Sequence, residues 1–426
     1  MKPCNMLLLN PEIKTNKDLP NMALAYGATI LNSKVIDLNT EPKPRKRFLD
    51  QKTDVLGISI QSRAFQEAKR IKEEYEKKYP QAKIKSVQTP IDVQCCYPFV
   101  DFYPEPAEGI EEKIIVEGEF SNNLPFPNYQ LFDSFGIFKK NWQRGKWAYP
   151  IMTSLGCPYQ CIYCMAGNRP WKARTAQNCF EELKQAKERW KIKSFQIIDD
   201  CFSFDKPRVL EFCRQIKPLN LNWFCTNGLR ADLFDEEIAK AMSEAGCQQM
   251  SFGVETIDPG LLLKIKKGET IEQIEKAVEI AKKYFKMLNL YFIIGLPGST
   301  YQKDLKNFHW AVKNKVKAHF SYFVPFTNHF GNSSPFYGQG AGSISSAYHK
   351  RLQKRLYNMA GYMRGDVSNL AISKNILKSF IFILVFDTKN IFSHFGNFLN
   401  IIYNKILSKL VQGSTLHNAK SWKKQR

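Results

Sequence analysis

A regular alternation of short apolar runs with amphipathic segments, at about 30 residues per unit, extends from Trp147 to Phe326. The segments between the runs have helical spacing of apolar residues, as at 180–190, 235–245 and 271–284. Six such units predict an open, partial (β/α)6 barrel, whose functional site lies at the carboxyl ends of its strands. The predicted strands are residues 148–154, 194–198, 222–226, 249–254, 288–294 and 319–325.

The sequence before this repeat predicts a second α/β unit. Apolar runs at 6–9, 34–38 and 55–60 alternate with a charge-rich helical segment at 64–78. Such alternation favours a mostly parallel, Rossmann-like sheet. We therefore predict an α/β protein with an N-terminal domain at 1–120, a Pro-rich linker at 121–146, the barrel at 147–335 and a basic helical C-terminal region at 336–426.

The positive charge is concentrated in the C-terminal region. The chain has 62 Lys and Arg against 40 Asp and Glu, and residues 341–426 contain 14 basic residues and two acidic ones. Bulky apolar residues interleave with these charges, which is typical of helices that cover the open barrel or, alternatively, lie as peripheral helices on an anionic membrane. No apolar run approaches the roughly 20 residues that cross a bilayer, and the N-terminus has no recognisable signal peptide. We expect a cytoplasmic protein, with peripheral contact at the inner face of the membrane as the alternative.

Three cysteines follow the first predicted barrel strand at Cys-x3-Cys-x2-Cys spacing: Cys157, Cys161 and Cys164. Thiolates on one short loop can turn inward around three corners of a cubane iron–sulfur cluster, which leaves one iron open. A zinc site is the alternative, but zinc takes four ligands and no fourth Cys or His stands nearby. The loop therefore indicates a [4Fe-4S] cluster with one coordination position free.

This loop resembles the signature of the radical S-adenosylmethionine (SAM) superfamily, with Tyr163 at the aromatic position before the third cysteine. The resemblance implies that the open iron chelates the amino and carboxylate groups of SAM, and that Tyr163 lies near the adenine. It further implies that an electron, from a donor such as flavodoxin or ferredoxin, cleaves SAM to methionine and a 5′-deoxyadenosyl radical that attacks the substrate.

Four further residues match family motifs at the ends of predicted strands: Asp200, Asn227, Glu255 and Gly295. The resemblance implies that Asp200 holds the methionine ammonium, that Glu255 binds the ribose hydroxyls, and that Asn227 and Gly295 line the SAM site, Gly295 beside the adenine. From the residues alone, Asp199-Asp200 could instead cap a helix, Glu255 could be a surface ion-pair partner, and the Gly295 segment could be a plain turn.

For the following residues we expect no cofactor role. Lys266-Lys267 also matches a family pattern, but a lysine pair is usually solvated, so we expect no function for it. The remaining cysteines in the barrel lack ligand spacing and are expected to be small core residues. They are Cys179, Cys201, Cys213, Cys225 and Cys247.

The first 120 residues resemble, more loosely, the cobalamin-binding-type domain that precedes this barrel in a large subgroup of the superfamily. The resemblance makes cobalamin a candidate cofactor. All six histidines fall at His309 or later, so no imidazole of this domain can ligate cobalt. The sequence thus predicts a radical SAM enzyme that catalyses methyl transfer, or rearrangement or cyclisation after hydrogen abstraction, on an unknown small-molecule or lipid substrate. A noncatalytic cluster protein or an RNA-binding protein is the alternative, although nucleic acid is not an expected partner because interleaved basic and aromatic motifs are absent.

Overall fold

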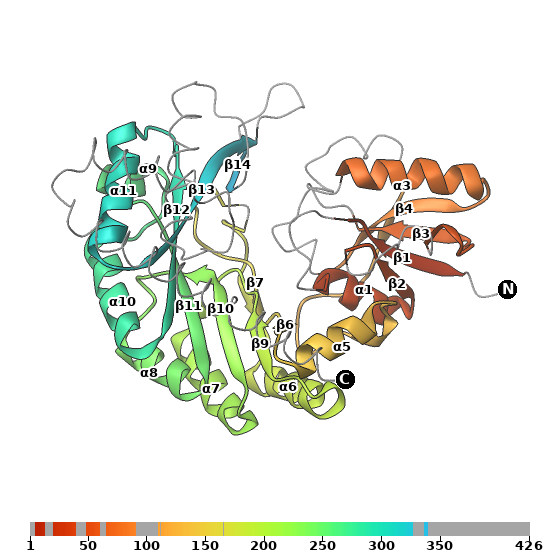
Figure 1. Ribbon diagram of the computed structural model, residues 1–426, viewed down its shortest axis with the longest axis horizontal. Coiled ribbons are helices and arrows are strands. Elements are labelled where there is room, and N and C mark those ends of the chain that lie inside the picture. The colour runs from red at the N-terminus through yellow and green to blue at the C-terminus, as the bar shows by residue number, and fades with distance from the viewer. Residues whose placement is uncertain are drawn as a thin grey trace, which may run out of the picture.

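The computed structural model describes residues 5–12, 20–39, 48–59, 65–90, 110, 112–164, 166–326 and 336–339. These residues form two α/β parts that lie side by side, an N-terminal sheet and a larger curved sheet (Figure 1). The class predicted from the sequence is confirmed. The predicted site residues stand at or near the carboxyl ends of the barrel strands, as described below.

The N-terminal sheet has five parallel strands in the order β2-β1-β3-β4-β5. This is the doubly wound 2-1-3-4-5 order, in which ligands bind at the carboxyl ends of the strands near the β1/β3 switch point. Strand β1 begins on the side away from the barrel and runs toward it (Figure 1), so the carboxyl ends of these parallel strands face the barrel. The strands are β1 (Met6–Asn10), β2 (Lys34–Asp37), β3 (Val55–Ile58), β4 (Lys83–Gln88) and β5 (Lys113–Ile115).

Two helices cover opposite faces of this sheet. The predicted helix is α3 (Phe65–Lys78), which packs Ile71 and Tyr75 into one apolar core. On the other face lies α1 (Met22–Leu31), which begins at its cap Asn21 and ends at Asn32 in the left-handed conformation. The apolar periodicity of the sequence does not indicate α1, because small or apolar residues occupy nearly every position and leave no polar face to set a helical period.

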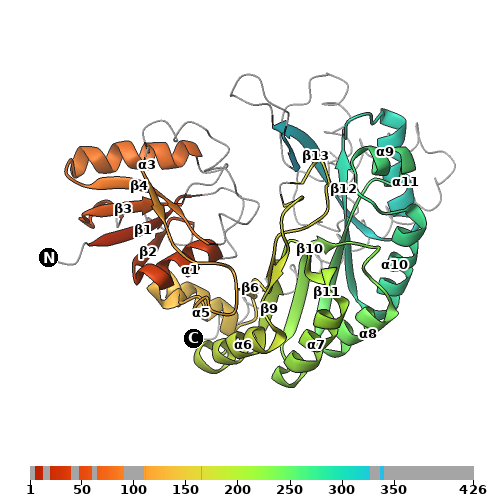
Figure 2. The same ribbon diagram turned by 180° about the vertical axis from the view of Figure 1, so that it is seen from behind.

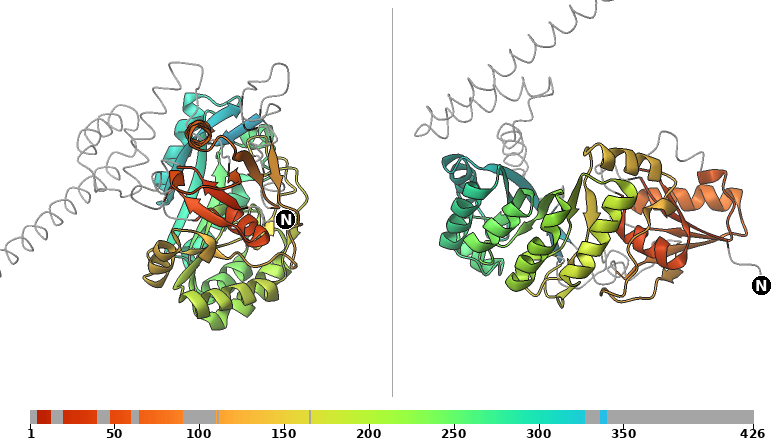
Figure 3. Two further views of the ribbon diagram at one scale, coloured as in Figure 1. Left: turned by 90° about the vertical axis from the view of Figure 1, so that its right-hand side faces the viewer. Right: turned by 90° about the horizontal axis from the view of Figure 1, so that it is seen from below.

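The larger sheet confirms the partial barrel. Its order is β14-β13-β12-β11-β10-β9-β6, and the six strands from β6 to β13 are parallel. The helices lie along the outside of the curved sheet (Figures 2 and 3). The strands are β6 (Tyr149–Ile151), β9 (Ser194–Ile197), β10 (Asn222–Leu229), β11 (Cys247–Glu255), β12 (Met287–Ile294), β13 (Lys317–Phe326) and the antiparallel β14 (Phe336–Gln339). The helices are α6 (Ala176–Trp190), α7 (Lys206–Ile216), α8 (Glu236–Glu244), α9 (Pro259–Lys264), α10 (Ile271–Tyr284) and α11 (Tyr301–Lys313).

The first predicted barrel strand is divided into β6 and β7 (Ser154–Leu155), and β7 pairs with β8 (Lys172–Ala173). The physical reason is Asp199, whose buried carboxylate accepts the backbone N–H of Thr153 at 2.6 Å and the hydroxyl of Ser154 at 2.7 Å. These bonds take Thr153 out of the sheet ladder. The chain then turns into a two-stranded hairpin that encloses the cysteine loop.

The predicted linker forms a folded junction between the two sheets. It contains the 3₁₀ turn Tyr129–Leu131 and α5 (Phe135–Gln143), which lies between the N-terminal sheet and the barrel (Figure 1). Tyr129 and Trp142 are fully buried, with ring centroids 5.3 Å apart, and pack on Trp190 of α6. One apolar core therefore runs from Leu24 in α1 through these rings into the barrel.

Apart from β14, the predicted helical C-terminal region lies outside the described residues, and so do its predicted membrane contacts. Among the helices that the structure describes, none combines the length and the apolar character that crossing a bilayer would require.

Candidate active site at the cysteine loop

The cysteine loop, residues 156–171, connects β7 to β8, with Met165 outside the described residues, and backbone hydrogen bonds within the loop close it. Arg169 N–H donates to Cys157 O at 2.9 Å, and Cys164 N–H donates to Cys161 O at 3.1 Å. Gly156 begins the loop with φ of +85°, and a Cβ there would lie 2.2 Å from Pro170 O. Only glycine adopts this positive φ readily and has no Cβ to clash with Pro170 O, so the turn requires glycine at position 156.

The three thiols differ in their surroundings. Cys157 and Cys161 are half-buried, whereas Cys164 is exposed. A hydrogen bond from the Cys201 thiol lowers the pKa of Cys157 to about 7. Burial raises the pKa of Cys161, against the positive charges of Lys267 and Arg230. Burial of the thiol also raises the pKa of Cys164, to about 12. Three thiols on one loop fit a cluster in number and in kind.

Within the ranges that the structure covers, no group of three or more His, Cys, Asp or Glu side chains is gathered closely enough to hold a metal ion. The fit of the loop to a cluster therefore rests on its donor set and on the cations beside it, rather than on an assembled ligand sphere.

All five remaining barrel cysteines are buried, as predicted. Cys201 differs from the others because its thiol lies beside that of Cys157. The sequence spacing could not reveal this contact, since Cys201 follows β9 and Cys157 follows β7.

The two aspartates after β9 have separate positions. Asp199 is the buried acceptor that divides the first strand, and burial raises its pKa. Asp200 is half-buried and its Oδ2 accepts the N–H of Gly156 at 2.9 Å, at the base of the cysteine loop. The helix-capping alternative is wrong, because Asp205 caps α7. Asn227 joins the same region, since its Nδ2 donates to Asp199 O at 3.2 Å.

Glu255 ends β11 in the left-handed conformation, with φ of +63°, and is only 3% exposed. Its Oε1 lies 3.9 Å from Lys267 Nζ, and its buried Oε2 has no hydrogen-bond partner. The surface-pair alternative is therefore wrong. Burial raises the pKa of this carboxyl, against the charge of Lys267 and the hydroxyl of Tyr163. A buried carboxylate oxygen without a partner costs free energy unless a ligand donates to it.

Tyr163 lies beside Glu255, and Gly295 follows the neighbouring strand β12. Tyr163 is buried in an apolar cluster with Ile265, Ile293, Leu296 and Phe323, and its hydroxyl lies beside the Glu255 carboxylate. Gly295 adopts φ of +77° and donates its N–H to Asp304 Oδ2 at 3.1 Å. Burial raises the pKa of Asp304 to about 6. The structure thus brings Tyr163, Glu255 and the strand end before Gly295 together.

The expectation that Lys266-Lys267 is solvated is wrong for Lys267, which is 5% exposed. Lys267 Nζ lies 3.9 Å from Glu255 Oε1 and 3.9 Å from Glu269 Oε1. Arg230, also buried, lies 3.7 Å from Glu269 Oε1, and burial raises the pKa of Glu269 to about 7. A buried charged network therefore lies beneath the cysteine loop. The match of Lys266-Lys267 to a family pattern could have indicated that Lys267 belongs to the site. The general rule that lysine pairs are solvated led to the wrong expectation.

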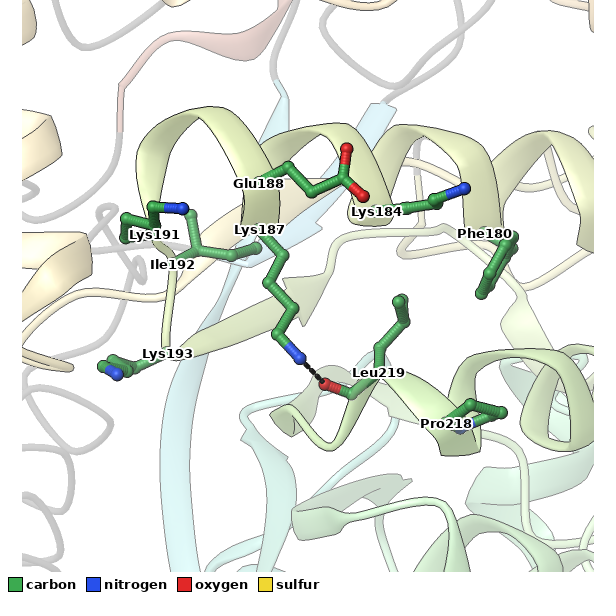
Figure 4. A pocket seen from close by; sticks show the side chains of 9 residues that line it. All are labelled: Phe180, Lys184, Lys187, Glu188, Lys191, Ile192, Lys193, Pro218 and Leu219. Atoms are coloured by element: carbon green, nitrogen blue, oxygen red, sulfur yellow. Dashed lines mark hydrogen bonds between the residues drawn. The ribbon is translucent and has the colours of Figure 1, made fainter.

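A separate pocket lies on the outer surface, over the end of α6 (Figure 4). It has four lysines at its rim, Lys184, Lys187, Lys191 and Lys193, and Lys187 Nζ donates to Leu219 O at 2.7 Å. None of the predicted site residues lines it, so the pocket is distinct from the cysteine loop.

Comparison with known proteins supports this interpretation of the barrel. Residues 151–310 match the family model of the Radical SAM superfamily. An uncharacterized methyltransferase of Pyrococcus horikoshii is 31% identical over 209 residues, which are 48% of this chain and 45% of that protein. The cytidylyl-2-hydroxyethylphosphonate methyltransferase of Streptomyces wedmorensis is 25% identical over 185 residues, or 41% of this chain and 35% of that protein. The chain thus spans less than half the length of these relatives.

Two solved structures have the same two-part fold. TsrM, a radical SAM methyltransferase from Kitasatospora setae with cobalamin and a [4Fe-4S] cluster bound, has a TM-score of 0.57 and 17% identity, and the match covers 75% of each chain. The cobalamin-dependent radical SAM enzyme OxsB has a TM-score of 0.56 and 16% identity, with 85% of this chain and 56% of that chain covered.

The barrel with its cysteine loop is therefore a radical SAM domain, and such a domain implies a [4Fe-4S] cluster and SAM as cofactors. Residues 151–310 thus match the Radical SAM superfamily, and the two-part fold of the described residues is similar to that of TsrM and OxsB.

Proposed function

We propose that this chain is a radical SAM enzyme that cleaves SAM reductively to begin radical chemistry on a small-molecule substrate. The observation that carries the proposal is the unpartnered, buried Oε2 of Glu255 in the same site as the three-cysteine loop. A carboxylate oxygen of this kind suits a ligand that brings hydroxyl donors, and SAM brings a ribose diol.

The proposed roles follow from the position of each residue. Cys157, Cys161 and Cys164 would ligate the cluster, and Asp200, at the base of their loop, would pair with the methionine ammonium. Glu255 would accept from the ribose. Tyr163, with Asn227 and Gly295, would complete the wall of the site, Tyr163 and Gly295 beside the adenine. The likeness of these positions to family motifs supports the roles.

When bound, the cluster supplies the electron that divides SAM into methionine and a 5′-deoxyadenosyl radical. The protein contributes binding, orientation and exclusion of water. We expect the anaerobically reconstituted and reduced protein to release 5′-deoxyadenosine from SAM, measured by chromatography. An intact cluster that releases none would favour the noncatalytic alternative. The natural electron donor would be a low-potential flavodoxin or ferredoxin.

Glu255→Gln is expected to weaken SAM binding by about 10- to 100-fold, because a hydrogen bond to a charged group contributes roughly 1.5–3 kcal/mol. Equilibrium dialysis with the reconstituted protein measures the effect. The exposed Glu244→Gln serves as the matched control, since Glu244 pairs with Lys217 on the outer helices.

Binding of a second ligand distinguishes the proposed role of Glu255 from that of Asp200. 5′-Methylthioadenosine has the ribose but lacks the amino acid group. Glu255→Gln should weaken its binding too, whereas Asp200→Asn should weaken SAM alone. Equal effects of Glu255→Gln and Glu244→Gln on SAM would contradict the ribose role.

Methyl transfer is the favoured reaction, since both solved structures of the same fold are cobalamin proteins, of which TsrM is a methyltransferase, and two curated relatives are named methyltransferases. Cobalamin would lie at the carboxyl ends of the N-terminal strands, where Asn10 and Asn39 donate to the buried Asp37 carboxylate at 3.0 Å. It would bind without a histidine ligand to cobalt, since the domain has no histidine. A corrinoid spectrum after anaerobic purification distinguishes this reaction from a cobalamin-free cyclisation. Cyclisation is the second candidate because one relative, from Rubrivivax gelatinosus, is named an anaerobic magnesium-protoporphyrin IX monomethyl ester cyclase.

A further inference from the structure

Arg230 follows β10, and three hydrogen bonds and one aromatic ring hold its guanidinium group. Its Nε and Nη2 donate to the two oxygens of Asp232, each at 2.9 Å, and its Nη1 donates to Lys267 O at 2.8 Å. The flat face of the guanidinium lies 3.5 Å from the ring centroid of Tyr159. A residue fixed in this way, at 5% exposure, has one orientation.

Tyr159, on which the Arg230 guanidinium stacks, belongs to the cysteine loop. It stands between Cys157 and Cys161, and its carbonyl accepts the N–H of Asn168 across the loop. A cation stacked on an aromatic face is attracted by the ring, which favours one relative position of the two side chains. The stack therefore connects the third strand of the barrel to the middle of the cysteine loop.

The charge of Arg230 also acts on the loop. Arg230 Cζ lies over the ring of Tyr159, which is two residues from Cys157 and two residues from Cys161, so the guanidinium stands beside the middle of the loop. Asp232 partly offsets this charge through its bidentate pair with the guanidinium. The guanidinium, which is the positive member of the pair, thus contacts the loop through Tyr159.

We propose that Arg230 is a positioning residue, which holds the cysteine loop through Tyr159 and whose charge raises the reduction potential of the cluster that this loop binds. The inference rests on the proposed function. Reduction adds one negative charge, and a fixed cation in a water-poor region stabilises that charge more than bulk water would. Arg230 and Asp232 form one pair with opposite effects on the potential.

The test is a redox titration of the reconstituted cluster without SAM, followed by electron paramagnetic resonance. Arg230→Met should shift the midpoint potential to a more negative value, because it removes the cation and leaves Asp232 uncompensated. Asp232→Asn should shift the potential in the positive direction, and Arg230→Lys should restore most of the wild-type value. Arg214→Met, which removes an exposed bidentate pair with Glu211 on α7, should cause no shift.

Opposite shifts from the two members of one pair are a result that a purely structural role would not produce. Shifts of the same sign, or shifts no larger than that of Arg214→Met, would overturn the proposal. If Arg230→Met fails to retain iron, Asp232→Asn and Arg230→Lys still decide the question. A wild-type protein that forms no [4Fe-4S] cluster would instead refute the proposed function, so the two failures are distinguishable.

Discussion

Replacement of Cys161 by alanine is expected to abolish SAM cleavage and to remove most of the bound iron. Cys161 is the central thiol of the loop, and its neighbours Cys157 and Cys164 would then offer only two thiolates. Two thiolates leave a cubane with two open irons, and metal sites that lose a ligand lose affinity sharply. The measurements are iron content after reconstitution and 5′-deoxyadenosine release under reducing conditions.

Two other cysteine variants make this result specific. Cys213→Ala changes a thiol buried in α7, far from any ligand role, and should keep both the iron and the cleavage. Cys201→Ala removes the thiol beside Cys157 and should also keep the cluster. If Cys201→Ala lost the iron as Cys161→Ala does, Cys201 would be a fourth ligand and no iron would be open to SAM. Sustained cleavage in Cys161→Ala would refute the assignment of the loop.

Glu182→Ala is expected to lower the free energy of unfolding by about 3–5 kcal/mol, because it leaves a buried charge without its partner. Glu182 in α6 and Arg174 after β8 are each 2% exposed, with Oε2 and Nη1 2.6 Å apart. Tyr149 donates its hydroxyl to Glu182 Oε1 at 2.8 Å. Arg174 also donates to Tyr26 of α1 at 3.4 Å, so the pair lies at the junction of the two domains.

Urea-induced unfolding, monitored by tryptophan fluorescence, measures the effect of this substitution. Glu211→Ala, which removes the exposed pair with Arg214, is the matched control and should cost at most about 1 kcal/mol. The double variant Arg174→Met/Glu182→Leu should recover most of the loss, since an apolar pair of similar volume avoids the uncompensated charge. A cost for Glu182→Ala that is no greater than that for Glu211→Ala would contradict the buried-pair argument.

Much of the barrel could be predicted because parallel strands buried on both faces appear as continuous apolar runs. The six runs after Trp147 all became strands of one sheet. Asp200, Asn227, Glu255 and Gly295 could be found because each belongs to a family motif at the end of a strand. The junction was harder to predict, since the rings of Tyr129 and Trp142 pack on Trp190, which stands in a later helix.

By itself, the sequence determined the βα period, the three thiols on one loop and the carboxylates at the strand ends. These features are local, because each depends on residues close together in the chain. Only the tertiary structure decided that Lys267 and Arg230 are buried cations beneath the cysteine loop and that Cys201 lies beside Cys157. The environment of a charge or a thiol depends on groups from other strands, and the curvature of the sheet determines which of those groups meet.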